Sequence, residues 1–189
     1  MSKWEMLLFD DAISDVTKFA TKIKKEDYLP KGEYQIIDQG KDYIAGYTNI
    51  SNGLFTDVPA LIFGDHTRII KYIHQPLFIG ADGVKLLKIS KKNLDTKFVY
   101  YYLKSRKIID TGYNRHFKWL KEFEIPFPYP STQNRIVDIL DCVNGLIAKR
   151  KTQIEKLDLL IKSRFSETIL LSFFYYSATL YCFYNVGEC

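Results

Sequence analysis

Cysteine is scarce in this sequence and its spacing is irregular. Cys142, Cys182 and Cys189 form no paired pattern, which excludes a disulfide scaffold and a four-ligand zinc site. The N-terminus has no charged segment followed by an apolar run, so it shows no sign of a secretory signal. These absences predict a protein of the reducing cytoplasm.

The motifs of several enzyme classes are also missing. The chain has neither a glycine-rich cofactor loop nor an Asn- or Asp-Pro-Pro-aromatic site, both of which a self-sufficient DNA methyltransferase needs, and it has no Walker lysine loop and no Gly-x-Ser-x-Gly elbow. His66 and His74 are eight residues apart and His116 is remote, a spacing that matches no common zinc motif. Scattered carboxylates such as Asp65 and Asp82 have no ordered metal pattern. We therefore expect no catalytic residue, no metal ligand and no cofactor on this chain.

Basic charge is concentrated in one stretch. The 189 residues are 47% hydrophobic and 26% charged, which predicts a folded protein, and the net charge is +5. Between residues 85 and 121 there are eleven Lys or Arg, opposed only by Asp95 and Asp110, and seven aromatic residues lie among them. This pattern fits equally a solvated helical face over an aromatic core and a surface that binds nucleic-acid phosphates.

Short apolar runs separated by turn residues predict strands in the first 130 residues. We expect strands at residues 34–37, 43–50, 59–63, 77–81 and 84–89. Apolar residues at helical spacing predict a helix at 94–107, and a helical turn is expected at 119–123. Residues 125–130 have alternate prolines, which remove hydrogen-bond donors, so regular structure is not expected there.

A long amphipathic helix is predicted after that proline run, with Ser131 as its N-cap. Its apolar residues recur at heptad spacing, interrupted only by Arg150. These helix-pairing candidates are Ile136, Leu140, Val143, Ile147, Ile154, Leu157 and Ile161. A helix of about 30 residues, or about 45 Å, cannot bury this seam on a small domain alone, so it either crosses the domain or pairs with another helix. The length of the seam and the charged residues around it favour pairing.

The predicted fold class is therefore α+β: a mixed α/β domain at residues 1–130, followed by a coiled-coil-type helix at 131–167. Residues 168–189 form an aromatic tail that has no charge from Thr168 to Gly187. Its length fits a membrane span, but its tyrosine and other polar residues and the lack of a following basic cluster favour burial at an interface or an adventitious sequence.

Several short motifs, in this order and spacing, resemble the specificity subunit of type I restriction-modification systems. The resemblance covers roughly residues 4–167. The matching runs are DQGK (38–41), IAGY (44–47), IFGDHTR (62–68), GADGVK (80–85), GYNRHFK (112–118), IPFP (125–128), QNRIV (133–137) and LDLLIKSRF (157–165).

The resemblance implies a target recognition domain followed by a conserved spacer helix. It implies a non-catalytic subunit that binds double-stranded DNA and directs a modification (methyltransferase) subunit, which supplies S-adenosylmethionine binding, and a restriction subunit to a bipartite target. Family members usually carry two recognition domains and two antiparallel helices, whereas this chain has one of each. We therefore expect a homodimer formed through the spacer helix.

The resemblance also implies that loops of the recognition domain meet base edges while basic residues hold phosphates. The candidate DNA-binding residues are Arg115, His116, Lys118, Arg68, Thr67, His66, Asn49, Asn52, Lys85, Lys104 and Lys107. Each has a structural alternative. Arg115 could contact guanine or form a buried pair with an aspartate. His66 and Thr67 could contact a base or a phosphate, or they could stabilise a turn. Asn49 and Asn52 could contact adenine or simply form a turn.

Two other functions remain as alternatives at this stage. A stand-alone DNA methyltransferase or nuclease is disfavoured by the missing cofactor and base-pocket motifs. A membrane-associated interaction protein is supported only by the uncharged tail. The DNA target, its spacing and the origin of the tail do not follow from the sequence.

Overall fold

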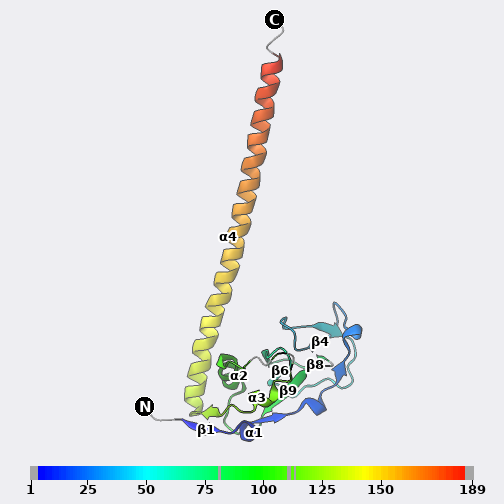
Figure 1. The fold of residues 1–189 in the computed structure, drawn as a ribbon, viewed down its shortest axis with the longest axis vertical. Helices are drawn as coiled ribbons and strands as arrows, with labels where there is room; N and C mark the ends of the chain where they lie inside the picture. Colours follow the sequence, from blue (N-terminus) through cyan, green and yellow to red (C-terminus); the bar gives the residue numbers. More distant parts are fainter. Residues whose placement is uncertain (1–3, 81, 110–111, 113, 186–189) are drawn as a thin grey trace. The chain divides into compact units, whose positions relative to one another are not determined.

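The computed structural model describes residues 4–80, 82–109, 112 and 114–185, with the side chains of Glu167 and residues 170–185 left out. The chain divides into two units, residues 1–140 and residues 141–189, and each is described by itself. Figure 1 shows the order of the elements along the chain. The combination of mixed sheets with a long C-terminal helix confirms the α+β prediction.

The first unit contains two four-stranded sheets. The first has the order β2-β9-β6-β7 and is antiparallel throughout. Its strands are β2 (Ile13–Asp15), β9 (Val84–Ile89), β6 (Ala60–Gly64) and β7 (Ile70–Ile73). In the second sheet, of order β3-β8-β4-β5, β8 runs parallel to β3 and β4 while β4 and β5 are antiparallel. Its strands are β3 (Lys22–Ile23), β8 (Leu77–Gly80), β4 (Tyr34–Ile37) and β5 (Gly46–Thr48).

Strand β6 lies at the centre of the core because both of its faces are covered. Leu61 and Phe63 pack in a cluster with residues of helix α2 (Thr96–Ser105), and Ala60 and Ile62 pack on the other face with residues of β4 and β8. A strand buried on both faces needs a continuous apolar run instead of an alternating one. Burial of each large side chain contributes about 1.5–3 kcal/mol relative to exposure.

Helix α2 confirms the helix predicted at 94–107. It begins after Asp95, whose side chain accepts a hydrogen bond from the Phe98 backbone N–H at 2.7 Å and so caps the N-terminus. The predicted strands at 34–37, 59–63 and 84–89 are also confirmed, and β8 matches the described part of 77–81. The strand predicted at 43–50 is shorter, and the helical turn predicted at 119–123 lies two residues earlier, as α3 (Phe117–Leu120).

The prediction that residues 125–130 lack regular structure is wrong. Strand β10 (Ile125–Phe127) pairs antiparallel with β1 (Glu5–Leu7), with Pro126 opposite Met6. In an antiparallel pair, alternate residues face away from the partner, so a proline is tolerated where its missing N–H would point outward. The remaining short elements are α1 (Phe9–Ala12), η1 (Thr17–Phe19) and η2 (Lys25–Asp27).

Helix α4 (Pro130–Asn185) begins one residue before the predicted N-cap and is longer than the predicted helix. Proline suits the first helical position because its missing N–H has no helical partner there. The first turns belong to the first unit, where Gln133 is fully buried. Its amide oxygen accepts from the Asp95 N–H at 2.8 Å, and its NH₂ donates to the carbonyls of Asn93 (3.0 Å) and Pro128 (2.8 Å).

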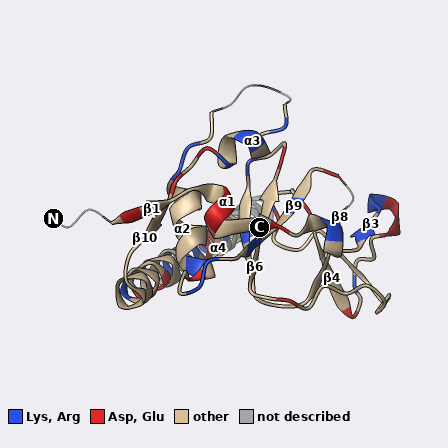
Figure 2. Ribbon diagram, turned by 90° about the horizontal axis from the view of Figure 1, so that it is seen from below, with Lys and Arg blue, Asp and Glu red and all other residues tan. Residues whose placement is uncertain are grey.

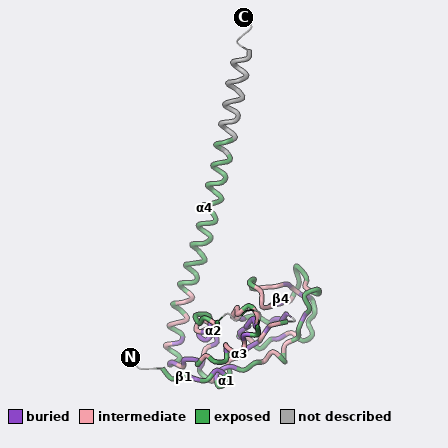
Figure 3. The backbone as a smooth tube through the Cα atoms, in the orientation of Figure 1, coloured by how far each residue is buried: buried purple, intermediate pink, exposed green. Residues whose placement is uncertain are grey.

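The predicted pairing residues fall into two groups. Ile136 packs against the first core cluster, so it already has a partner inside the first unit. Leu140 is half-buried. The others lie exposed on α4, and Figure 3 shows that exposure along the described side chains of the second unit. Those exposed residues are Val143, Ile147, Ile154, Leu157 and Ile161.

The predicted tail at 168–189 continues α4 as far as Asn185, but its side chains lie largely outside the described residues. Among the described residues, no helix combines the length and the apolar character that a membrane crossing requires. The predicted domain boundaries at residues 130 and 167 stay predictions.

Candidate nucleic-acid interface

Three turns of the first unit meet at one end of the two sheets. They follow β4 (residues 38–42), β6 (65–69) and β8 (described residues 82–83) in the chain. Gln39 joins the first two turns: its side-chain oxygen accepts from the His66 backbone N–H at 3.2 Å, and its carbonyl accepts from the Thr67 hydroxyl at 2.7 Å. The Asp65 N–H donates to the Gly83 carbonyl in the third turn, so runs 38–41 and 62–68 and the described residues of run 80–85, which are scattered in the sequence, form one cluster.

Glycines make this close approach possible. A Cβ on Gly64 would collide with the Thr67 hydroxyl and lie 2.8 Å from the Gln39 Cβ. Gly83 has a positive φ of 65°, and a Cβ there would lie 2.6 Å from the Gln39 amide nitrogen. Larger residues at these positions would push the turns apart, so the glycines are required by packing.

Asp65 connects the same cluster to the segment before α3. It is only 4% exposed. Its carboxylate accepts a hydrogen bond from the Phe117 N–H at 2.7 Å, and its carbonyl accepts one from the His116 N–H at 2.9 Å. Its own N–H donates to the Gly83 carbonyl at 2.7 Å. Its carboxylate is thus engaged in holding the backbone of this segment.

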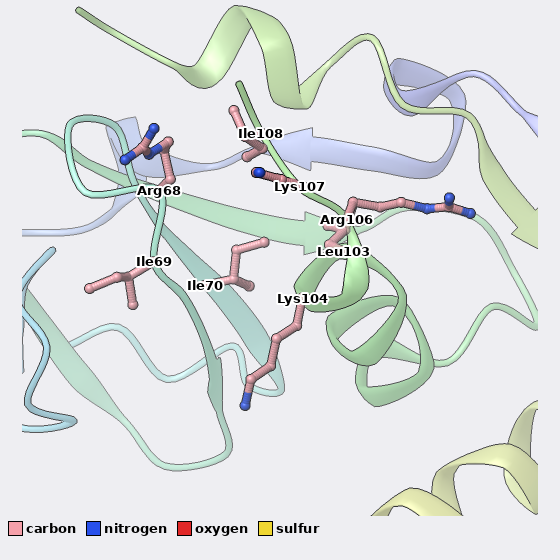
Figure 4. Close-up of a pocket in the computed structure, with 8 residues that line it drawn as sticks. All are labelled: Arg68, Ile69, Ile70, Leu103, Lys104, Arg106, Lys107 and Ile108. Atoms are coloured by element: carbon pink, nitrogen blue, oxygen red, sulfur yellow. The ribbon is translucent and has the colours of Figure 1, made fainter. Parts of the chain in front are cut away.

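A basic hollow lies beside this cluster, between the start of β7 and the C-terminal end of α2. Its volume is about 530 Å³. Figure 4 shows that the lining residues come from two sides, with residues 68–70 facing residues 103–108. Its cationic residues are Arg68, Lys104, Arg106 and Lys107. Leu103 and three isoleucines supply the apolar part of the lining.

A second hollow of about 760 Å³ adjoins the first and shares Ile69, Ile70 and Lys104 with it. Aromatic side chains are prominent in its lining: Tyr43, Tyr72 and Tyr100, together with His74. It adds the cationic residues Lys41, Lys71 and Lys97. We call the two hollows together the basic groove. No carboxylate is among the described residues that line it, so it attracts anions.

Lys71 forms part of the floor of the groove and is not available to a ligand. Its side chain is 4% exposed, and its ammonium donates to the carbonyls of Asp38 (2.8 Å) and Asp42 (2.5 Å). Burial lowers the pKa of Lys71, although the carboxylates of Asp38 and Asp42 oppose this effect. The ammonium therefore orders the turn that carries Lys41 and Tyr43 into the groove.

The structure separates the candidates of the 112–118 run. Arg115 and Lys118 are exposed, and Lys118 lies over the Trp119 ring at 4.7 Å. The alternative of a buried Arg–Asp pair for Arg115 is therefore wrong. His116 is 1% exposed, and its Nδ1 lies 3.0 Å from the Asp65 carbonyl. Because a carbonyl only accepts, that nitrogen carries the proton, and the buried ring argues against direct contact with DNA. Figure 2 shows basic charge on α3, where the only Lys or Arg is Lys118.

The β6–β7 turn combines a structural and a surface role. Thr67 binds Gln39, which agrees with its turn-stabilising alternative, and half-buried His66 belongs to the same turn. Arg68 lines the groove and has a positive φ of 61°, which is uncommon for a residue other than glycine. Such strain in a surface hollow is typical of functional positions.

Lys85, Asn49 and Asn52 lie outside the groove lining. Lys85 forms an ion pair with Asp15 at 3.0 Å and lies 4.9 Å from the centre of the Phe117 ring, so its charge is already engaged. Asn49 accepts a hydrogen bond from the Glu33 N–H at 3.0 Å, which agrees with the plain-turn alternative. Asn52 is exposed in a turn. Lys104 and Lys107 are exposed in the groove.

Sequence reasoning missed Lys41, Tyr43 and His74 as lining residues, since they come from segments far from the basic stretch. It also missed Lys97, Arg106 and Tyr100, although these lie inside that stretch. Lys104 donates to the Tyr100 hydroxyl at 2.9 Å and Arg106 lies 4.5 Å from the centre of the Tyr102 ring. The aromatic residues among the lysines were the available signal. Within the described residues, no cluster of three or more His, Cys, Asp or Glu could hold a metal ion.

Comparisons with known proteins agree with this geometry. The family model for the type I restriction modification DNA specificity domain matches residues 1–157. The type I restriction enzyme EcoR124I/EcoR124II specificity subunit of Escherichia coli is 27% identical over 154 residues, which cover 72% of this chain and 38% of that protein.

Two solved structures share the fold. The S subunit of a type I restriction-modification system from M. genitalium has a TM-score of 0.58 at 22% identity, covering 76% of this chain and 39% of that one. The HsdS subunit from Thermoanaerobacter tengcongensis has a TM-score of 0.51 at 16% identity, covering 77% of this chain and 38% of that one. This chain spans about two fifths of the length of these relatives. It belongs to the family of type I restriction-modification DNA specificity domains.

Proposed function

We propose that this chain is a DNA-recognition subunit that binds one part of a bipartite target through the basic groove and residues 114–118, which we call the Arg115 segment. The observation that carries the proposal is a concave surface that combines cationic and aromatic side chains and has no carboxylate in its described lining. Lys and Arg neutralise phosphates and release counterions, so such a surface gains affinity for a nucleic-acid backbone.

The groove and the Arg115 segment have different roles in this proposal. Flexible lysines such as Lys104 and Lys107 hold phosphates, which position the duplex without reading its sequence. Arg115 is exposed and forms no ion pair or hydrogen bond among the described residues, so its guanidinium is available for bidentate contact with the major-groove edge of guanine.

The groove is tested with the full chain and a labelled random-sequence duplex. We expect Lys104→Glu and Lys107→Glu to lower affinity for all sequences alike and to reduce the slope of log affinity against log salt by about 0.9 for each lost phosphate contact. Lys31→Glu, an exposed residue outside the groove lining, makes the same charge change and is the control. Equal losses in the groove variants and the control would refute the assignment of the groove.

Arg115 is tested by selection from randomised duplexes and by methylome sequencing with the gene present and deleted. We expect Arg115→Ala to change the preference at one base pair by about 1–3 kcal/mol. An unchanged motif with unchanged affinity would remove Arg115 from the interface.

The partners and the non-catalytic role belong to the same proposal. We infer that the chain acts in the cytoplasm and directs a methyltransferase subunit, which binds S-adenosylmethionine, and a restriction subunit to double-stranded DNA. The supporting observations are the family membership and the absence of cofactor-loop motifs from the sequence.

Self-association completes the proposal. The exposed apolar residues of α4 form a stripe that soluble monomers generally avoid. Two copies with antiparallel helices would place Arg150 near the middle of the pair, where the like charges oppose association, although Arg150 donates to Gln153 on its own helix at 2.9 Å. We expect a dimer in sedimentation at micromolar concentration, tightened by Arg150→Leu, and a target that is a split inverted repeat. A methylated motif with two unlike halves would show that a different chain supplies the second domain.

A further inference from the structure

We propose that Asp65 is a positioning residue for DNA recognition, which sets the place of Arg115 relative to the basic groove without contacting DNA. This inference rests on the proposed function. It assigns to a buried carboxylate beside the basic groove a role that charge alone would not predict.

The contacts of Asp65 leave its carboxylate little access to DNA. The residue is 4% exposed, and the carboxylate accepts from the Phe117 N–H at 2.7 Å. A hydrogen bond to an ionised acceptor is about twice as strong as one between neutral groups. The carboxylate therefore acts as a fixed anchor for the backbone that directly follows Arg115 and His116.

The backbone of Asp65 adds further contacts to the same segment. Its carbonyl accepts from the His116 N–H at 2.9 Å and lies 3.0 Å from the His116 Nδ1. Its N–H donates to the Gly83 carbonyl at 2.7 Å. Carboxylate and carbonyl thus hold two successive residues of the Arg115 segment, and the N–H ties them to the turn after β8.

Asp65 lies in the same turn as a residue of the basic groove. Arg68, which lines the groove, follows it by three residues in the same turn. Residues 65–68 therefore connect the basic groove with the Arg115 segment. If that connection is lost, we expect the groove to keep its phosphate contacts while Arg115 loses its defined place.

Electrostatics alone predicts that removal of this carboxylate raises the affinity for DNA, whereas the positioning role predicts that it lowers the affinity. A negative charge near a DNA-binding surface repels phosphates, so its loss should raise affinity. Asp65→Asn removes the charge but keeps a side-chain oxygen that accepts from the Phe117 N–H. Asp65→Ala removes both. The comparison of these two variants separates the positioning role from the charge.

The experiment measures binding of the full chain to the duplex that selection from randomised DNA enriches. We expect Asp65→Ala to lower affinity about tenfold, as Arg115→Ala does, and Asp65→Asn to keep affinity within about threefold of the parent. Adding Arg115→Ala to Asp65→Ala should cost little more, whereas Lys104→Glu should lower affinity by the same factor in both backgrounds. Asp57→Ala, an exposed carboxylate on the surface, is the charge-matched control.

Limited trypsin cleavage gives a readout that does not need DNA. In Asp65→Ala we expect faster cleavage after Arg115 and Lys118 than in the parent, with other sites unchanged, and in Asp65→Asn a rate close to the parent. If Asp65→Ala fails to fold, as thermal unfolding will show, His116→Ala removes the ring contact with the Asp65 carbonyl while both backbone N–H donors remain, and it should raise the rate of cleavage after Arg115 to a smaller extent.

Two results would overturn the inference. The first is an equal affinity for DNA of Asp65→Ala and Asp65→Asn. The second is a double variant, Asp65→Ala with Arg115→Ala, whose fold-loss in affinity equals the product of the two single losses. Failure of the proposed function looks different. In that case the parent chain would not bind any duplex, while cleavage after Arg115 would still depend on the residue at position 65.

Discussion

A methyl group added at Gly64 tests whether the turns after β4 and β6 are held in contact. Gly64 is buried, and its φ is not in the left-handed region, so alanine is acceptable to the backbone and the effect of Gly64→Ala is purely steric. The new Cβ would collide with the Thr67 hydroxyl and come within 2.8 Å of the Gln39 Cβ and 3.3 Å of its Cα. The collision displaces the hydroxyl that donates to the Gln39 carbonyl.

The expected loss in the free energy of unfolding follows from three contributions. Overpacking costs about 1–3 kcal/mol, and loss of the hydrogen bond between Thr67 and Gln39 costs about 1 kcal/mol. Alanine also lowers the entropy of the unfolded chain, which stabilises the folded protein by about 0.4–1 kcal/mol. We expect Gly64→Ala to be destabilising by about 1–3.5 kcal/mol, measured by urea unfolding followed through the fluorescence of Trp119 in a Trp4→Phe background.

A double mutant identifies the collision. Combining Gly64→Ala with Thr67→Ala removes the nearest colliding atom, so the two losses should fall short of additivity by at least about 1 kcal/mol. Gly145→Ala is the matched control, because Gly145 lies exposed on α4 and a Cβ there meets nothing within 4 Å. It should stabilise the helix by about 0.5–1 kcal/mol. A Gly64→Ala protein within about 0.5 kcal/mol of the parent, or full additivity with Thr67→Ala, would refute the packing argument.

Two further predictions concern polar groups of the first unit. Gln133→Ala removes three buried hydrogen bonds where α4 begins, and we expect a loss of about 3 kcal/mol in urea unfolding, against less than about 0.5 kcal/mol for the exposed neighbour Asn134→Ala. The pKa of Asp15 is lowered: burial alone raises it, but hydrogen bonds from Thr17 and the ion pair with Lys85 outweigh burial. Its stabilising effect is therefore present above its unfolded pKa of about 3.8 and lost as the pH falls through the lower folded value. The stability difference between the parent and Asp15→Asn should thus be largest near neutral pH and become smaller as the pH falls below 3.8, and a difference that stays constant over this range would contradict the assignment.

The strands of the core were predictable because local sequence determines them. The continuous apolar run at 59–63 ends at Gly64-Asp65, and burial of β6 on both faces requires such a run. Helix α2 was predictable for the same reason, since its apolar spacing and its Asp95 cap are local signals. Strand β10 was not predictable, because Pro126 suits a strand only when the partner lies on its other side, and that partner is the N-terminal β1.

The site was predicted less completely than the fold because side-chain roles depend on contacts distant in sequence. His116 lies in the basic 112–118 run and was therefore predicted to bind DNA, but it is buried against Asp65, which is 51 residues away in the sequence. Lys71 lies in a segment of alternating apolar and basic residues, where a lysine is normally exposed. It is buried because the turn at 38–42 directs two carbonyls at its ammonium. Nothing in the sequence near Lys71 or His116 indicates these partners.

The division between buried and exposed residues explains how such a surface can change its target. Gln39, Gly64 and Asp65 hold the turns together through contacts inside the fold, so their substitution costs stability. Lys104 and Arg115 are exposed, and surface substitutions away from special features usually change stability by less than about 0.5 kcal/mol. Substitution at these proposed DNA contacts is therefore expected to cost little stability, whereas substitution at the buried residues that place them costs more. A recognition domain built in this way can acquire a new DNA preference through exposed substitutions and keep the same scaffold.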